Sequence, residues 1–121
     1  MSNAEKMTLD EFHKKIAIQT NNGIWPTLDK DNPSQEELDQ ALHMAHTSHY
    51  HWSKIGEPIN RARAEYMIAR VYSAMGEGAR AVHHAEICLK ITEETGMGDF
   101  DLAFAYEVLA KAHAANDDLK L

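Results

Sequence analysis

The chain has 121 residues, of which 44% are hydrophobic and 26% charged, a balance that fits one soluble globular domain. Its formal net charge of −7 argues against non-specific binding to nucleic acid or to an anionic membrane, because both need a basic surface. We find no signal-peptide pattern, no apolar run near the roughly 20 residues that span a bilayer, and one cysteine, so no internal disulfide framework. We therefore expect a cytoplasmic protein.

The first expected helix begins just after the N-terminus. Ser2-Asn3-Ala4 resembles the remnant of an expression tag, so residues 1–6 are expected to be disordered and residues 7–121 to form the domain. Thr8 is followed three residues later by Glu11, a capping-box pattern that predicts a helix start. Apolar residues then follow at helical spacing, and the polar run at residues 21–23 is expected to end this helix.

Two further helices are predicted after a linker over residues 24–33. The segment 34–37 (SQEE) is a second capping box and predicts the next helix, which Gly56 is expected to end. Pro58 suits the first turn of the third helix, where its missing N–H costs no hydrogen bond. That helix is expected to run to about Met75.

The last two helices complete an all-α fold. Gly76 and Gly78 are expected to bracket the turn before the fourth helix, and Gly96 and Gly98 are expected to close that helix. Asp99 can cap the fifth, which is expected to extend to about Ala115. Alternation of apolar and polar residues never persists, so no strand is expected. The sequence thus predicts an all-α fold of five helices.

Two segments of the chain repeat. The helix over residues 62–76 recurs over residues 103–117, and residues 41–45 recur as 81–85. In the first pair the alanines Ala62, Ala64, Ala69 and Ala74 correspond to Ala103, Ala105, Ala110 and Ala115. The copies lie 41 residues apart in the first case and 40 in the second. A period of this size predicts stacked helix pairs, because one pair cannot bury its apolar face without a neighbour.

The region from Asn60 to Asp117 resembles the tetratricopeptide repeat (TPR), in a variant with longer helices. The resemblance is carried by Ala69, Tyr72, Gly76, Ala81, the pair Cys88-Leu89 and, in the second copy, Ala110. The second copy departs from the family pattern at His113, where an aromatic residue is expected, and at Asp117, where glycine is expected. The resemblance implies antiparallel α-hairpins stacked as a TPR-like right-handed superhelix.

The resemblance also implies a peptide-binding site, because TPR arrays bind extended peptides on their concave side. Carried over position by position, this site consists of Arg63, Tyr66, Arg70, Ser73, Phe104, Glu107 and Lys111. The first three share one helix face, where two guanidinium groups around a phenol suit a carboxylate or an acidic segment. The alternative is that these charges are solvated and pair with Glu65 or Glu107.

The fifth helix carries apolar residues nearly all round its surface, whereas a terminal helix of a repeat array normally has a polar outer face. Another element must therefore cover it. We expect either that a second copy of the chain does so, giving a homodimer through the C-terminal helix, or that the N-terminal helix folds across it.

The chain also has eight histidines, four of them between His43 and His51. A metal ion would need a further ligand from another helix, such as His83, His84 or His113. The alternative is a polar surface with one buried ring, His49, and we predict no metal and no cofactor. No phosphate loop, nucleophile elbow or zinc-protease motif suggests a catalytic residue.

Together these observations predict a non-catalytic protein–protein interaction module that binds a peptide or protein segment and self-associates. The alternative is a metal- or small-ligand-binding helical protein that uses the histidine-rich helix over residues 34–55.

Overall fold

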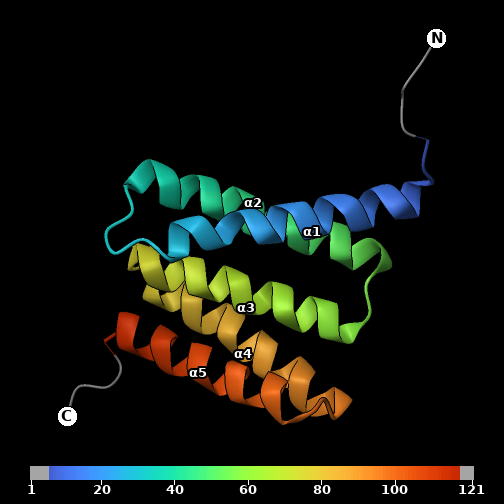
Figure 1. The fold of residues 1–121 in the computed structure, drawn as a ribbon. Helices are drawn as coiled ribbons and strands as arrows, with labels where there is room; N and C mark the ends of the chain where they lie inside the picture. The colour runs from blue at the N-terminus through green and yellow to red at the C-terminus, as the bar shows by residue number, and fades with distance from the viewer. Residues whose placement is uncertain (1–5, 118–121) are drawn as a thin grey trace.

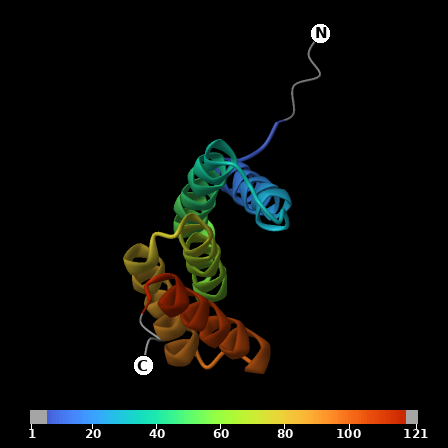
Figure 2. The same cartoon turned by 90° about the vertical axis from the view of Figure 1, so that its left-hand side faces the viewer.

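The computed structural model describes residues 6–117, and within that range the chain is all α, as predicted, with no strand. Its five helices are α1 (Leu9–Leu28), α2 (Gln35–Ile55), α3 (Pro58–Met75), α4 (Gly78–Thr95) and α5 (Asp99–Ala115). Each helix packs against the next one in the chain, and α3 also contacts α1 and α5 (Figure 1). The stack is curved, with α1 and α5 towards its two ends and α3 between them (Figure 2). None of the described helices is long and apolar enough to cross a membrane.

Both predicted capping boxes are formed. The backbone N–H of Glu11 donates to Thr8 Oγ1 over 3.1 Å, and the N–H of Thr8 donates to Glu11 Oε1 over 2.9 Å. Ser34 and Glu37 make the same reciprocal pair at the start of α2, over 3.1 and 2.9 Å. Each box satisfies two N–H groups that a helix start otherwise leaves without a partner, which fixes where α1 and α2 begin.

The first helix is longer than expected. We predicted that residues 21–23 would end it and that a linker would begin at residue 24, but α1 continues to Leu28 with Pro26 inside it. Ile24 is fully buried, and a Cβ on Gly23 would lie 2.4 Å from the Met44 side chain of α2. Close packing of this segment against α2 thus outweighs its low helix propensity.

The last helix differs from expectation in two respects. Asp99 is the first residue of α5 rather than its cap, and the N-cap position is occupied by Gly98. The suggestion that the N-terminal helix covers α5 is wrong, because α1 packs against α2 and α3 instead. The hydroxyl of Ser48 on α2, itself buried, donates to the Ala17 carbonyl of α1 over 2.8 Å and ties the first two helices together.

The duplicated segments share details of burial and backbone conformation. Residues 41–50 of α2 and 81–90 of α4 follow the same order of buried, half-buried and exposed positions. After α3 the chain turns at Gly76 with φ of 76°, and 41 residues later Asp117 takes φ of 64°. Asp117 therefore adopts the left-handed conformation that the glycine position requires, although it is not glycine. Assignment to the TPR family remains a prediction.

Candidate functional site

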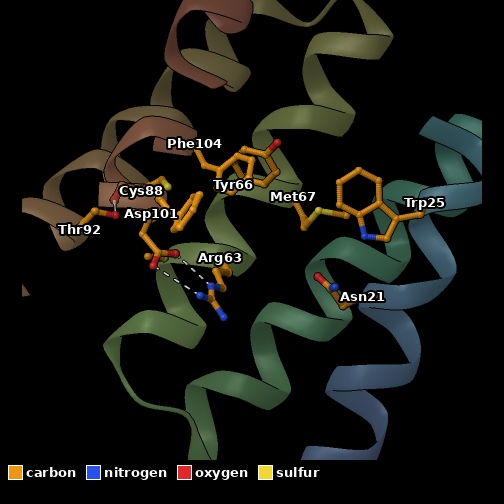
Figure 3. A pocket seen from close by; sticks show the side chains of 11 residues that line it. Asn21, Trp25, Arg63, Tyr66, Met67, Cys88, Thr92, Asp101 and Phe104 are labelled. Atoms are coloured by element: carbon orange, nitrogen blue, oxygen red, sulfur yellow. Dashed lines mark hydrogen bonds and ion pairs between the residues drawn. The ribbon is translucent and has the colours of Figure 1, made fainter. Parts of the chain in front are cut away.

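A pocket of about 280 Å³ lies where α1 faces the helices α3 to α5 (Figure 3). Its lining residues are Asn21 and Trp25 of α1, Ala62, Arg63, Tyr66 and Met67 of α3, Cys88 and Thr92 of α4, and Phe100, Asp101 and Phe104 of α5. Three of the predicted peptide-binding residues, Arg63, Tyr66 and Phe104, therefore lie in one pocket. The helical spacing that predicted a shared face for Arg63 and Tyr66 places both on the pocket side of α3.

Arg63 is paired with a carboxylate of the last helix. Its Nε lies 3.1 Å from Asp101 Oδ1 and its Nη2 lies 3.4 Å from Asp101 Oδ2, so the pair is bidentate. The Arg63 side chain is 62% exposed, whereas that of Asp101 is 16% exposed. We suggested Glu65 or Glu107 as the partner of these arginines, and for Arg63 this is wrong, because α5 places Asp101 against it.

Arg70, Tyr66 and Glu107 form a second polar group beside the pocket. Arg70 Nη1 donates to Tyr66 Oη over 2.9 Å, and the same phenol lies 3.4 Å from Glu107 Oε1. Arg70 Nη1 also lies 3.7 Å from Glu107 Oε1, so the suggested pairing of an arginine with Glu107 is confirmed here. The Arg70 guanidinium stands 5.6 Å from the centre of the Trp25 ring of α1, within cation–π range. Burial raises the pKa of Tyr66, so its phenol stays protonated.

Two phenylalanines of α5 are exposed at this pocket. Phe104 is 50% exposed and packs edge-on against Tyr66, with ring centres 5.8 Å apart. Phe100, which we did not assign to the site, is 83% exposed. It lies one helical turn before Phe104, and this spacing on a helix already placed in the site is the signal that could have identified it.

Four of the seven predicted residues are absent from the pocket lining: Arg70 and Glu107 lie beside the pocket, and Ser73 and Lys111 lie further along their helices. Lys111 is exposed on α5. The hydroxyl of Ser73 is buried and has no hydrogen-bond partner among residues 6–117. The site that the structure brings together is therefore the part of the predicted groove between Arg63 and Arg70 on α3 and the facing turns of α5.

A smaller hollow of about 170 Å³ adjoins this pocket and shares Asn21 and Arg63 with it. Its other lining residues are Ile18, Asn22, Trp52, Asn60 and Ala64. The three asparagine amides make this hollow more polar than the first pocket. We expected Trp52 to belong to the core, but it is half-buried and borders this hollow.

A buried carboxylate lies on the side of α3 that faces α2 and α4. Glu65 is 6% exposed, and its two oxygens lie 2.9 Å from His49 Nε2 and 2.6 Å from His84 Nδ1. Burial acts to raise the pKa of Glu65, but the hydrogen bonds from both histidines outweigh it and hold this pKa at about 2. We predicted one buried ring, His49, on the apolar face; its side chain is 33% exposed, and it is joined to His84 through Glu65, which we had considered only as a possible partner of the arginines.

Of the other histidines, His46 and His83 lie beside His84, with their ring centres 5.9 and 5.0 Å from its own. His13 and His51 are joined by a hydrogen bond of 2.8 Å between their Nδ1 atoms, and His46 Nε2 lies 3.3 Å from the Tyr72 hydroxyl. Within residues 6–117, no group of three or more His, Cys, Asp or Glu side chains is arranged to hold a metal ion. Five histidines, His13, His46, His49, His51 and His84, are paired with other side chains.

Comparison with known proteins does not identify the chain. No protein-family model, no curated protein and no solved structure matches it. The function must therefore be inferred from the groove and its chemistry.

Proposed function

We propose that this protein is a non-catalytic, cytoplasmic interaction module that binds a peptide or protein segment in the groove between α1, α3 and α5, and that it self-associates. One observation carries the proposal. Aromatic side chains that remain half or more exposed, Phe100 and Phe104, gather at a pocket whose other walls come from three further helices. Exposed aromatic groups around a concave pocket are typical of binding surfaces, because they lose unfavourable contact with water when a partner arrives.

The groove can be tested by capturing partners from a lysate with the immobilised protein. Replacing Phe104 by serine removes a ring that is 50% exposed, so the fold should tolerate it while the groove loses contact area. The matched control is Tyr50→Ser, since Tyr50 is 56% exposed but lies on α2, outside the groove. We expect F104S to lose partners that the wild type and Y50S retain. Equal retention by all three would show that the groove is not the binding surface.

Self-association is proposed through the outer face of α5. On α3 the corresponding face is covered by α4: Ala62 and Cys88 share a buried cluster, and Glu65 bonds to His84. On α5 the corresponding residues, Ala103 and Tyr106, are exposed, and Tyr106 is 51% exposed. A helix with a second apolar face and no cover is typical of an interface, and a second copy can supply the missing helix.

Light scattering after size-exclusion chromatography tests this second part. We expect the wild type to have the mass of a dimer and Tyr106→Lys to have that of a monomer, because a buried lysine without a partner is costly. A wild type that stays monomeric as its concentration rises would remove the proposed dimer, and would leave the proposed groove unaffected.

A further inference from the structure

The chemistry of the pocket indicates which part of a ligand it takes. Its walls are largely apolar, with Trp25 on the α1 side, Met67 on α3 and the two phenylalanines on α5. Ala62 lines it and is 2% exposed, and Cys88 on α4 contributes a buried thiol. Burial raises the pKa of this thiol to about 11, so it is uncharged near neutral pH. The space therefore suits an apolar group.

The polar side chains around the pocket are nearly all engaged already. Arg63 is paired with Asp101, and Tyr66 is bonded to Arg70. The hydroxyl of Thr92 donates to the carbonyl of Cys88 over 2.8 Å. The charges of both arginines are already balanced by Asp101 and Glu107, so the site offers an anionic ligand no unpaired positive charge, whereas a neutral group needs none.

Asn21 is the exception. Its side chain lines both the pocket and the adjoining polar hollow, and it lies on the α1 side of the opening, across from Arg63 (Figure 3). Among residues 6–117 it makes no hydrogen bond or other polar contact. A primary amide both donates and accepts, so it can bond to the N–H and the C=O of a peptide chain at once.

The size and rim of the pocket favour one side chain over a complete small molecule. Its volume of about 280 Å³ lies just below the range of roughly 300–1,000 Å³ that encloses drug-sized ligands. Phe100 and Phe104 are left 83% and 50% exposed, so contact with a ligand would continue beyond the pocket itself. A peptide with one residue anchored inside satisfies both conditions.

We propose that the pocket is the anchor site for a single uncharged aromatic or long aliphatic side chain of the bound peptide, and that Asn21 holds the peptide main chain next to this anchor. The proposal rests on the peptide-binding function proposed above and states its specificity. From the sequence we expected the two arginines to bind an acidic segment. Because Arg63 is paired with Asp101 and Arg70 with Glu107, we propose an uncharged anchor residue instead.

A display library of random short peptides, selected on the purified full chain, tests this specificity. We expect the selected peptides to share one aromatic or long aliphatic residue at a fixed position and no required acidic residue. Labelled copies of these peptides then report affinity by fluorescence anisotropy. Ala62→Leu fills the pocket and should weaken binding about tenfold or more, as expected for losing the burial of a large apolar side chain.

The matched control is Ala74→Leu, because Ala74 lies on the same helix as Ala62 but is exposed and outside the pocket. Asn21→Ala should weaken binding several-fold, whereas Gln19→Ala, at an exposed position on the same helix, should not. If A62L is not folded by circular dichroism, Phe100→Ser takes its place, since an 83% exposed side chain contributes little to the fold.

The outcomes separate the two proposals. Selected peptides that lack a common apolar residue, or that bind A62L (or F100S, where it replaces A62L) as tightly as the wild type, would overturn the anchor site and leave the peptide-binding function standing. Selected peptides that share the apolar residue but tolerate N21A would overturn the role of Asn21. If no peptide is enriched at all, the peptide-binding function and the anchor site both fail.

Discussion

At the scale of single residues, the most unusual feature is an acidic side chain in the core. Glu65 is 6% exposed, and an isolated carboxylate at such a position would be strongly destabilising. Two histidines from different helices, His49 of α2 and His84 of α4, donate to it instead. The carboxylate therefore links three helices, and its charge is stabilised by hydrogen bonds at both oxygens.

This cluster predicts how stability depends on pH. The pKa of Glu65 is lowered from 4.5 to about 2 in the folded state, so its ionised form stabilises the fold above pH 4.5. That contribution, on the order of 3 kcal/mol, is lost as the pH falls from 4.5 towards 2. The hydrogen bond to Glu65 raises the pKa of His49, which therefore adds stability below pH 6.5 that is lost as the pH rises through its folded-state pKa.

Burial, followed by the charges of His84 and His49, lowers the pKa of His46. Its contribution has the opposite sign: it is present above pH 6.5 and is lost as the pH falls through its folded-state pKa. The contributions of His49 and His46 to the pH dependence of stability therefore have opposite signs near neutral pH. Glu65 contributes to the pH dependence mainly below pH 4.5.

Glu65→Gln tests this assignment. Glutamine keeps the shape of the side chain but loses its charge, and its N–H₂ group faces one of the two histidine donors. We therefore expect the free energy of unfolding to fall by about 1–3 kcal/mol at neutral pH. The free energy of unfolding, measured by urea titration, should differ most between the two proteins above pH 4.5 and converge below it. A constant difference across the acid range would show that Glu65 is not the titrating group.

Sequence reasoning could not find this cluster. Glu65 lies between Ala64 and Tyr66 on a helix with other charges nearby, and a glutamate in that setting is normally solvated. Its burial depends on which helices flank α3, and no local pattern contains that information. By contrast, the shared face of Arg63, Tyr66 and Arg70 follows from helical spacing alone and could be predicted.

At the scale of helices, the starts of α1 and α2 were predictable, whereas the end of α1 was not. The capping boxes at Thr8 and Ser34 are local patterns, and both are formed. The end of α1 depends instead on packing: Ile24 is fully buried, and this contact extends the helix beyond residues whose propensity would end it. Local signals therefore located most of the fold, while tertiary contacts decided where α1 ends.

Contacts between helix ends give a second prediction, at Gly78. This glycine begins α4, and a Cβ there would lie 2.3 Å from the Cα of Asn116, just after α5. Helix propensity alone would make Gly78→Ala stabilising by up to about 1 kcal/mol. We expect G78A instead to lower the stability of the fold by about 1–3 kcal/mol. The new Cβ would meet backbone atoms of Asn116, so the end of α5 would have to move.

Thermal unfolding followed by circular dichroism measures this effect. Ala79→Gly in the same turn serves as the control, because Ala79 is exposed and its substitution reports propensity alone. A higher unfolding temperature for G78A than for the wild type would show that the residue after α5, Asn116, does not pack closely against Gly78.

At the scale of the whole molecule, the helices form a row in which each contacts mainly its neighbours. Within the described residues, α1 contacts α2 and α3 and does not contact α4 or α5. In such a row, a local change weakens the adjacent helix most and distant helices least. The buried hydrogen bond from Ser48 to the Ala17 carbonyl offers a test of this behaviour.

Ser48→Ala removes the hydroxyl that donates to the Ala17 carbonyl. We expect this to lower the free energy of local opening of α1 by about 1–2 kcal/mol. Amide hydrogen exchange should become faster along α1 and stay nearly unchanged along α5. Thr47→Ala is the matched control, because the Thr47 hydroxyl bonds to His43 within its own helix. Equally faster exchange in all helices would show that the chain unfolds as one cooperative unit.

The division of the pocket between α1 and the helices α3 to α5 has a mechanical consequence. Trp25 and Asn21 form one wall of the pocket, and both belong to α1, which forms a hairpin with α2. A tilt of this hairpin against the remaining helices would widen or narrow the pocket, so the size of the occupant and the hairpin angle would be coupled. A bound side chain would act as a wedge that selects one tilt, and Trp25 would report the change through its fluorescence.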